Sequence, residues 1–237
     1  MKADNRSRTR RAAATPASRR TKPLGRPQTT SREDIIACAI SILKQDPEAG
    51  VSINRVARAL GLTPMALYTY FAGRDELLQA VSARLLESLV VEIPAGAGWQ
   101  ARIDCWARGM RAHFLRFPYL MHILRWEGHI SVAWVQQMLL VFEALAEAGF
   151  RGRALAQAAV WIFYSIMGAI HAELAEIRSG YRFSASDIAH FSPQQRAWLT
   201  AFHRYADEKD YRNEAFDYHL AQLIDGIAAR MTRNSDT

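Results

Sequence analysis

The sequence has few of the residues from which metal centres, disulfide frameworks and redox sites are built. Of its 237 residues only Cys38 and Cys105 are cysteines, and they do not form the CxxC spacing that is typical of zinc and redox sites. Small secreted domains depend on several disulfides, so two separated cysteines indicate a reduced, cytoplasmic setting. The sequence therefore predicts no metal and no cofactor.

Catalytic motifs are missing as well. The sequence contains no HExxH, GxSxG, GxxxxGK[ST] or GxGxxG pattern, which are the spacings that common hydrolase, phosphate and dinucleotide sites require. Its seven histidines are scattered, and the nearest pairing, His171 with Glu173, points in different directions on a helix. We therefore expect no enzyme. A helical ligand-binding enzyme remains the alternative, and it would turn over a bound small molecule.

Long hydrophobic runs and strand-like alternation are also scarce. The sequence predicts no apolar run of about 18 residues, the length that a membrane helix needs, and its basic N-terminus lacks the apolar segment of a secretory signal. A soluble protein without a membrane partner is expected. Apolar residues recur instead with helical spacing from position 30 onward, so the predicted fold class is all-α.

Acidic residues are nearly absent from the first 32 positions, which hold ten Lys and Arg against Asp4 alone. This segment carries a charge of +9, so the other 205 residues carry −2 of the total of +7. A basic arm on a nearly neutral body indicates a polyanionic partner. Residues 1–29 also lack an apolar cluster and are predicted to be disordered in isolation.

The arm contains one short pattern with a known target. The segment KPLGRP, Lys22 to Pro27, resembles the core of an AT-hook, in which an extended Gly-Arg-Pro segment lies in a narrow A·T-rich minor groove. Arg26 is the residue expected to enter the groove. A solubilising tail without a DNA target is the alternative.

Three short helices are predicted after the arm. The first follows Thr30 or Ser31, and its apolar face is Ile36, Ala39, Ile40 and Leu43. Ser52 caps the second, whose buried face is Ile53, Val56, Ala57 and Leu60. Gly61 then supplies a turn, and Thr63 caps a third helix with Pro64 in its first position. Two helices joined by a glycine turn predict a helix-turn-helix domain over residues 30–77.

The third helix is predicted to enter the DNA major groove. Leu67 and Phe71 are four residues apart and face the core, which leaves Met65, Tyr68 and Thr69 toward the outside. Tyr70 lies beside them. Ordinary half-buried packing is the alternative for Tyr68 and Tyr70.

The stretch GVSINRVARALGLTPMALYTYFAGRDELLQAV, Gly50 to Val81, resembles the N-terminal domain of the TetR family of bacterial transcriptional regulators. It has the LYxYF core and the [KR]xELL start of the next helix, and the resemblance covers residues 31 to about 85. The implied DNA-contacting positions, beside Arg26 of the arm, are Ser52, Asn54, Arg55, Thr63, Pro64, Met65, Tyr68, Thr69, Tyr70 and Arg74.

These positions have different expected roles. Asn54 can pair with an adenine edge, and Met65 and Thr69 can contact a thymine methyl group. Ser52, Arg55, Tyr68 and Arg74 are expected at phosphates. Many family members have Gly where Met65 stands, so the bases that are read cannot be transferred from the family.

Residues 78–237 are predicted to form a larger helical domain for ligand binding and dimerisation. Aromatic residues and Met recur on three helical faces, together with one His: Trp106, Met110, His113 and Phe117; Trp134, Met138 and Phe142; Phe163 and Met167. Met and aromatic side chains adapt to bulky apolar ligands, and a His fixes orientation. A packed core is the alternative, while the resemblance implies an inducer within this domain.

Two further helices are predicted to be apolar on two sides, which is typical of central or interface helices. On the last helix one of these faces consists of small or modestly polar residues, and small residues let helices approach closely. The expected homodimer residues are Trp161, Gly168, His219, Gln222, Gly226 and Ala229.

Together these patterns predict a ligand-responsive DNA-binding regulator, most simply a repressor. It would bind a palindromic operator in double-stranded DNA as a homodimer and be released by a small apolar or aromatic effector. The alternative from another class is an architectural DNA-binding protein whose basic arm gives binding with little sequence preference.

Overall fold

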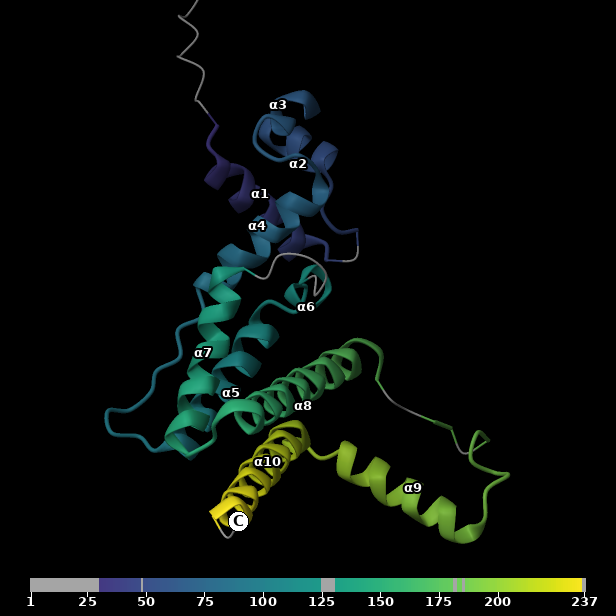
Figure 1. Ribbon diagram of the computed structural model, residues 1–237. Coiled ribbons are helices and arrows are strands. Elements are labelled where there is room, and N and C mark those ends of the chain that lie inside the picture. The colour runs from purple at the N-terminus through teal and green to yellow at the C-terminus, as the bar shows by residue number, and fades with distance from the viewer. Residues whose placement is uncertain (1–29, 48, 125–130, 181–182, 185, 236–237) are drawn as a thin grey trace, which may run out of the picture. The chain divides into compact units, whose positions relative to one another are not determined.

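Figure 1 shows the fold in a computed structural model, which describes residues 30–47, 49–124, 131–180, 183–184 and 186–235. These residues form helices joined by turns and loops, with no strand among them, so the all-α prediction is confirmed. The basic arm lies outside the described residues. So do the expectations for it, disorder over residues 1–29 and a minor-groove contact by Arg26.

Ten helices occur in the described part of the chain. They are α1 (Arg32–Gln45), α2 (Ile53–Leu60), α3 (Pro64–Tyr68), α4 (Arg74–Glu87), α5 (Trp99–Arg116), α6 (Leu120–Ile123), α7 (Val132–Glu147), α8 (Gly152–Ser179), α9 (Pro193–Ala206) and α10 (Tyr211–Ser235).

Side-chain caps start several of these helices where the sequence predicts them. The Ser52 hydroxyl accepts a hydrogen bond from the backbone N–H of Arg55 at 3.2 Å, and the Thr63 hydroxyl accepts one from Ala66 at 3.3 Å. Gly61 ends α2 in the left-handed region with φ of 67°, a conformation that favours glycine. These local interactions fix the tight connection between α2 and α3.

The buried face of α1 differs from the predicted one. Ile35 and Ala39 are fully buried, and Ile42 and Leu43 are nearly so, whereas Ile36 and Ile40 are only partly buried. The predicted face was wrong by about one residue, because helix packing against both α2 and α4 selects the Ile35 side of a helix that is apolar on two adjacent faces.

Helix α4 runs without a break across the boundary expected at residues 77 and 78. It packs against α1 and also against α6 and α7, and its buried residues extend from Leu77 in its first turns to Leu86 near its end. The helix-turn-helix helices and the larger helical part therefore share one continuous element.

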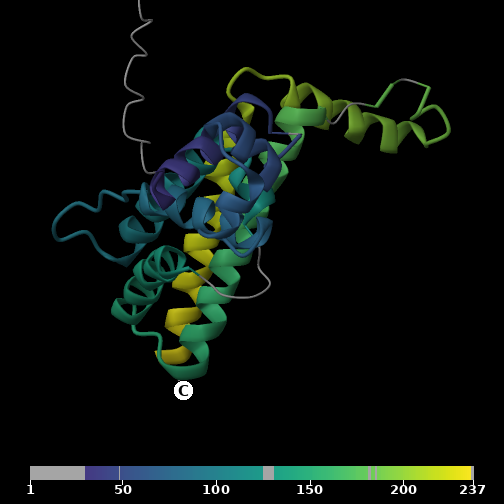
Figure 2. The same cartoon turned by 90° about the horizontal axis from the view of Figure 1, so that it is seen from above.

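The remaining helices form the larger part. Helix α5 packs against α7, and α8 packs against both α7 and α10; α8 and α10 lie side by side in Figures 1 and 2. Helix α9 projects away from this group and contacts α10. It begins with a capping box, in which Ser192 and Gln195 bond to each other's backbone N–H groups.

A buried ion pair joins three of these helices. Arg111 of α5 donates two hydrogen bonds to the carboxylate of Glu173 on α8, at 2.7 and 2.8 Å, and its guanidinium lies 4.7 Å from the ring centroid of Phe216 on α10. Both charged side chains are at most 13% exposed. Two parallel bonds to a carboxylate fix geometry as well as charge, so this pair sets how α5, α8 and α10 meet.

The expectation about apolar runs must be corrected at α8. Residues Gly152–Arg178 are long and apolar enough to cross a membrane by length and composition. A core helix passes the same test, and Ile162, Ile166 and Ile170 of α8 are completely buried within the fold. The apolar run therefore serves packing here.

Substitutions at two nearby residues of α3 should change the stability of the protein by very different amounts. Leu67 is completely buried and Met65 is 74% exposed. Leu67→Ala should lower the free energy of unfolding in urea by about 2–5 kcal/mol, because it leaves a cavity. Met65→Ala, the matched control, should change it by less than about 0.5 kcal/mol. Equal effects of the two substitutions would contradict this packing of α3.

Candidate DNA-binding surface and ligand-binding core

Helix α3 has one exposed face, and the residues on its opposite side are buried in the core. Met65 is 74% and Tyr68 48% exposed, while Leu67 and Phe71 below them are at most 1% exposed. Of the other sequence-predicted DNA contacts, six are exposed: Ser52, Asn54, Thr63, Pro64, Thr69 and Arg74. Exposed side chains on a short helix that is anchored by apolar residues are suited to enter the major groove of DNA.

Interactions of Arg32 fix the segment that follows α3. The Arg32 guanidinium at the start of α1 donates to the carbonyl of Tyr70 and to the carboxylate of Glu76 at 2.9 Å, and it lies 4.0 Å from the ring centroid of Phe71. Glu76 also accepts the N–H of Ala72 at 2.7 Å. That backbone bond, followed by the Arg32 bond, lowers the pKa of Glu76, so the carboxylate stays ionised at neutral pH.

Three predicted DNA contacts are engaged within the chain. Arg55 pairs with Asp46 at 3.1 Å and donates to the carbonyl of Gly50 at 2.9 Å. Arg74 donates from Nε to the carbonyl of Val51 at 2.7 Å, and Tyr70 is half-buried against the core. The structure therefore gives these side chains a positioning role that motif spacing does not reveal.

The nine sequence-predicted ligand residues lie in and beside the core. Six are buried: Trp106, Met110, His113, Trp134, Phe163 and Met167. Phe117, Met138 and Phe142 are partly buried. The rings of Trp106 and Phe142 lie 5.5 and 6.4 Å from that of Phe163, and the His113 ring lies 5.0 Å from that of Phe117. The structure thus brings five of the nine residues together in two ring groups, one around Phe163 and one formed by His113 and Phe117.

Several polar atoms in this core have no hydrogen-bond partner among the described residues. They are Nε1 of Trp106, Nε2 of His113 and Oε1 of Gln137. Trp106 and His113 lie on α5 and Gln137 on α7, and these two helices pack together. A buried polar atom without a partner costs free energy, so each of these atoms is suited to meet a polar group of a bound molecule.

His113 connects the core to α4. Its ring bonds to the backbone carbonyl of Leu85, near the end of α4, while burial lowers the pKa of the ring. The ring is therefore neutral at neutral pH, donates through one nitrogen to Leu85 and leaves Nε2 as an acceptor. Gln137 and the Leu85 contact were missed by sequence reasoning, although Gln137 interrupts the apolar face that Trp134 begins.

The predicted dimer residues lie on α8 and α10. Trp161, Gly168, Gln222 and Ala229 are exposed, and His219 and Gly226 are half-buried. Gly226 has a role within one chain: a Cβ added there would meet the ring of Trp161 at 2.7 Å. The small residue therefore makes room for Trp161 of the same chain, which the helical pattern alone does not show.

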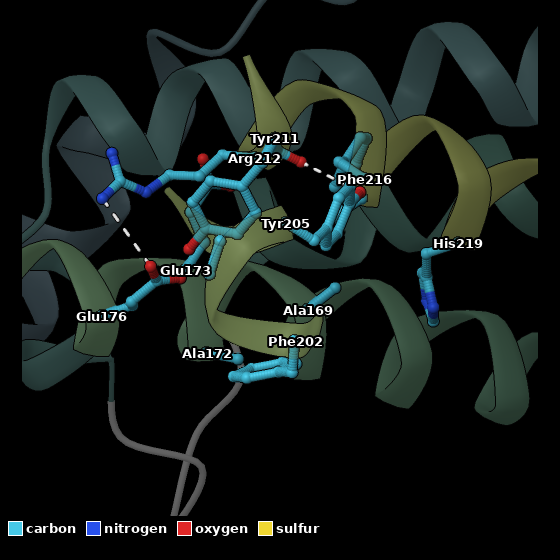
Figure 3. A pocket seen from close by; sticks show the side chains of 12 residues that line it. Ala169, Ala172, Glu173, Glu176, Phe202, Tyr205, Tyr211, Arg212, Phe216 and His219 are labelled. Atoms are coloured by element: carbon cyan, nitrogen blue, oxygen red, sulfur yellow. Dashed lines mark hydrogen bonds and ion pairs between the residues drawn. The ribbon is translucent and has the colours of Figure 1, made fainter. Parts of the chain in front are cut away.

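Figure 3 shows a pocket of about 350 Å³ formed by α8, α9 and α10. Its charged groups are paired: Arg212 lies 3.8 Å from Glu176, and Glu173 is held by Arg111. The aromatic side chains come from α9 and α10, among them Phe202 and Tyr211. None of the nine predicted ligand residues lines this pocket.

Helix α9 was not singled out by sequence reasoning. None of its residues is buried, and Trp198 and Phe202 are 63% and 55% exposed. Among the described residues no group of three His, Cys, Asp or Glu side chains could hold a metal ion.

Comparison with known proteins defines the class. Residues 35–81 match the family model for bacterial regulatory proteins of the tetR family. The chain is 25% identical to the transcriptional repressor DrrR1 of Streptomyces coeruleorubidus over 167 residues, which are 70% of this chain and 62% of that protein. It thus spans less than two thirds of that relative. It is 28% identical to the class A tetracycline repressor of transposon 1721 from Escherichia coli over 201 residues, 83% and 89% of the two chains.

The fold agrees with this match. A possible TetR family transcriptional regulator from Streptomyces coelicolor A3(2) superposes with a TM-score of 0.72, covering 84% of this chain and 99% of that chain. The two are 21% identical, so this likeness shows the fold. A short exposed helix after a glycine turn, on an all-α body, is the architecture of helix-turn-helix regulators of transcription. Residues 35–81 therefore form a DNA-binding domain of the tetR family of bacterial regulatory proteins.

Proposed function

We propose that this protein is a cytoplasmic repressor of the TetR family, which binds a palindromic operator as a homodimer and is released by a small apolar or aromatic effector. The exposed surface of α3 carries the proposal, because Met65 and Tyr68 project from a helix whose other face is completely buried. Both relatives described above are named repressors, which supports repression over activation.

The DNA contacts follow from the exposed side chains. Met65 and Thr69 are apolar enough to contact a thymine methyl group, and Asn54 can form two hydrogen bonds with adenine. Tyr68 donates its hydroxyl to a phosphate, as do the backbone and side-chain groups around Ser52. Arg26 and the basic arm add phosphate or minor-groove contacts, which raise affinity more than sequence preference.

The effector binds within the aromatic core. Its apolar body replaces contacts among the aromatic and Met side chains, and its polar groups meet Trp106 Nε1, His113 Nε2 or Gln137 Oε1, which lack partners among the described residues. A ligand that binds His113 contacts α4 indirectly, because the His113 ring is hydrogen-bonded to the backbone of Leu85. It shifts DNA affinity only if it binds the two conformations of the protein with different affinities.

The homodimer forms through α8 and α10. These helices lie side by side and expose large apolar residues: Val160, Trp161 and Tyr164 on α8, and Tyr218 on α10. A two-fold axis through such a surface places two recognition helices symmetrically, which matches the two half-sites of a palindrome.

The recognition surface is tested by Met65→Ala combined with Tyr68→Ala. Both residues are exposed, so the free energy of unfolding should stay nearly unchanged while operator affinity falls roughly 10- to 100-fold, the loss of one or two base or phosphate contacts. Fluorescence anisotropy with DNA from the protein's own upstream region measures the change, and a shuffled sequence is the control. Unchanged affinity would show that α3 does not read DNA.

Removing residues 1–29 in the same assay separates the repressor from an architectural DNA-binding protein. The repressor should lose affinity but keep its preference for the native fragment over the shuffled one. An architectural protein would lose binding altogether, and the intact chain would bind both fragments with equal, salt-sensitive affinity.

The effector site is tested by Gln137→Leu. Leu has a similar volume and no unpaired acceptor, so the substitution should raise the free energy of unfolding by about 1 kcal/mol. It should also weaken effector-induced release of DNA, measured by anisotropy in a screen of aromatic compounds. Val132→Lys on the exposed side of α7 is the control. Lower stability of Gln137→Leu with full effector response would contradict the proposed role.

The dimer is tested by sedimentation equilibrium. We expect twice the chain mass of 26.7 kDa. Tyr164 is 77% exposed on α8, and Tyr164→Lys should raise the dimer dissociation constant at least about tenfold by placing a charge in the apolar contact. Val132→Lys should leave it unchanged. An intact chain that sediments as a monomer would exclude the proposed α8 and α10 contact.

A further inference from the structure

A second cavity, of about 800 Å³, lies where the helix-turn-helix helices meet the larger helical part. Its walls come from the end of α1 and the segment before α2, the start of α4, helix α6, and the end of α8. Pockets for drug-sized molecules have volumes of about 300–1,000 Å³. The cavity is therefore large enough for an organic ligand that touches both parts of the chain.

Among the described residues, the positive charge that lines this cavity exceeds the negative charge. Arg74 and Arg178 line it from opposite parts of the chain, and neither forms an ion pair with a carboxylate of the described residues. Among the described residues of the lining, Asp46 is the only acidic one, and it is paired with Arg55 at 3.1 Å. The pocket of Figure 3 differs, because its carboxylates and arginines pair with each other.

The neighbours of Arg178 orient it without neutralising it. Its Nη1 lies 2.6 Å from Nε2 of His122, and since an arginine can only donate, the histidine nitrogen accepts. Partial desolvation, then Arg178 and His171, lower the pKa of His122. The ring is therefore neutral at neutral pH, and the guanidinium keeps its charge and its other donors for a further acceptor.

The rest of the lining is mostly apolar. Leu43 and Val51 contribute from one side, and Ile123 and Leu174 from the other. Tyr119 also lines the cavity; it is 96% buried, since only 4% is exposed, and its hydroxyl has no hydrogen-bond partner among the described residues. A ligand for this site combines an acceptor for Arg178 and Tyr119 with an apolar body.

We propose that this cavity binds an amphipathic organic anion, a carboxylate on an apolar ring or chain. The carboxylate contacts Arg178, with Arg74 adding to the positive potential, and the apolar body lies against Ile123 and Leu174. Such a ligand touches the segment before α2 and the end of α8 at once. It therefore favours one placement of the recognition helix relative to the larger part, at a site separate from the aromatic core.

Isothermal titration calorimetry of the full chain tests the proposal with 2-naphthoate and decanoate, and with neutral 2-naphthamide as the ligand control. We expect wild type to bind at least one anion, with naphthoate at least tenfold tighter than naphthamide. Arg178→Gln should lose about tenfold in anion affinity. Arg153→Gln, at the opposite exposed end of α8, should bind like wild type.

Two further variants place the bound anion. Ile177→Trp narrows the cavity without removing a charge and should weaken binding, whereas Gln137→Leu in the core should leave it unchanged. The proposal is overturned if neither anion binds wild type, or if Arg178→Gln and Ile177→Trp bind as wild type does. Loss of binding in Gln137→Leu alone would place the anion in the aromatic core and also overturn it. None of these readouts depends on DNA binding.

Discussion

Helix α4 has to satisfy two sets of neighbours at once, and the rest of the structure depends on this constraint. Its first residues meet the helix-turn-helix helices, where Arg74 bonds to the carbonyl of Val51, and its last turn offers the carbonyl of Leu85 to His113 in the core. A helix of 14 residues is about 21 Å long and stiff along its axis. A displacement at one end therefore has to be met by rearrangement at the other.

The recognition helix cannot stabilise itself. With five residues it is far below the length at which isolated helices persist in water, so its geometry comes from its surroundings. Leu67 and Phe71 anchor it from below, the cap at Thr63 starts it, and Arg32 secures the turn that follows. Because these contacts come from α1 and α4 as well, the DNA-reading surface responds to the packing of the whole small domain.

Sequence reasoning succeeds here where the signals are local. The caps at Ser52 and Thr63 and the turn at Gly61 are formed by residues within a few positions of one another, and the structure has them as predicted. The family match adds the DNA-reading helix.

The misses depend on contacts between residues far apart in the sequence. Periodicity gives an apolar face for α1 but not its partner, so Ile35 was overlooked in favour of Ile36. The ion pair of Arg55 with Asp46 is likewise not visible in the motif, and it leaves the predicted phosphate contact of Arg55 untested. The packing of the Trp161 ring against Gly226 is also not visible in the sequence, and the predicted dimer contact of Gly226 stays a prediction.

The distribution of charge and hydrogen bonds separates structural positions from candidate binding positions. Arg111 and Glu173 are almost fully buried, and each satisfies the other with two hydrogen bonds, as a structural pair must when its charges leave water. Gln137 in the core and Tyr119 at the second cavity are also buried, yet their polar atoms have no partner among the described residues. A fold selected for stability alone would replace such groups with apolar ones. Buried polar groups of this kind occur at two places, each close to α4 or to a helix that packs against it. A small molecule that completes their hydrogen bonds would offset the cost of burying them.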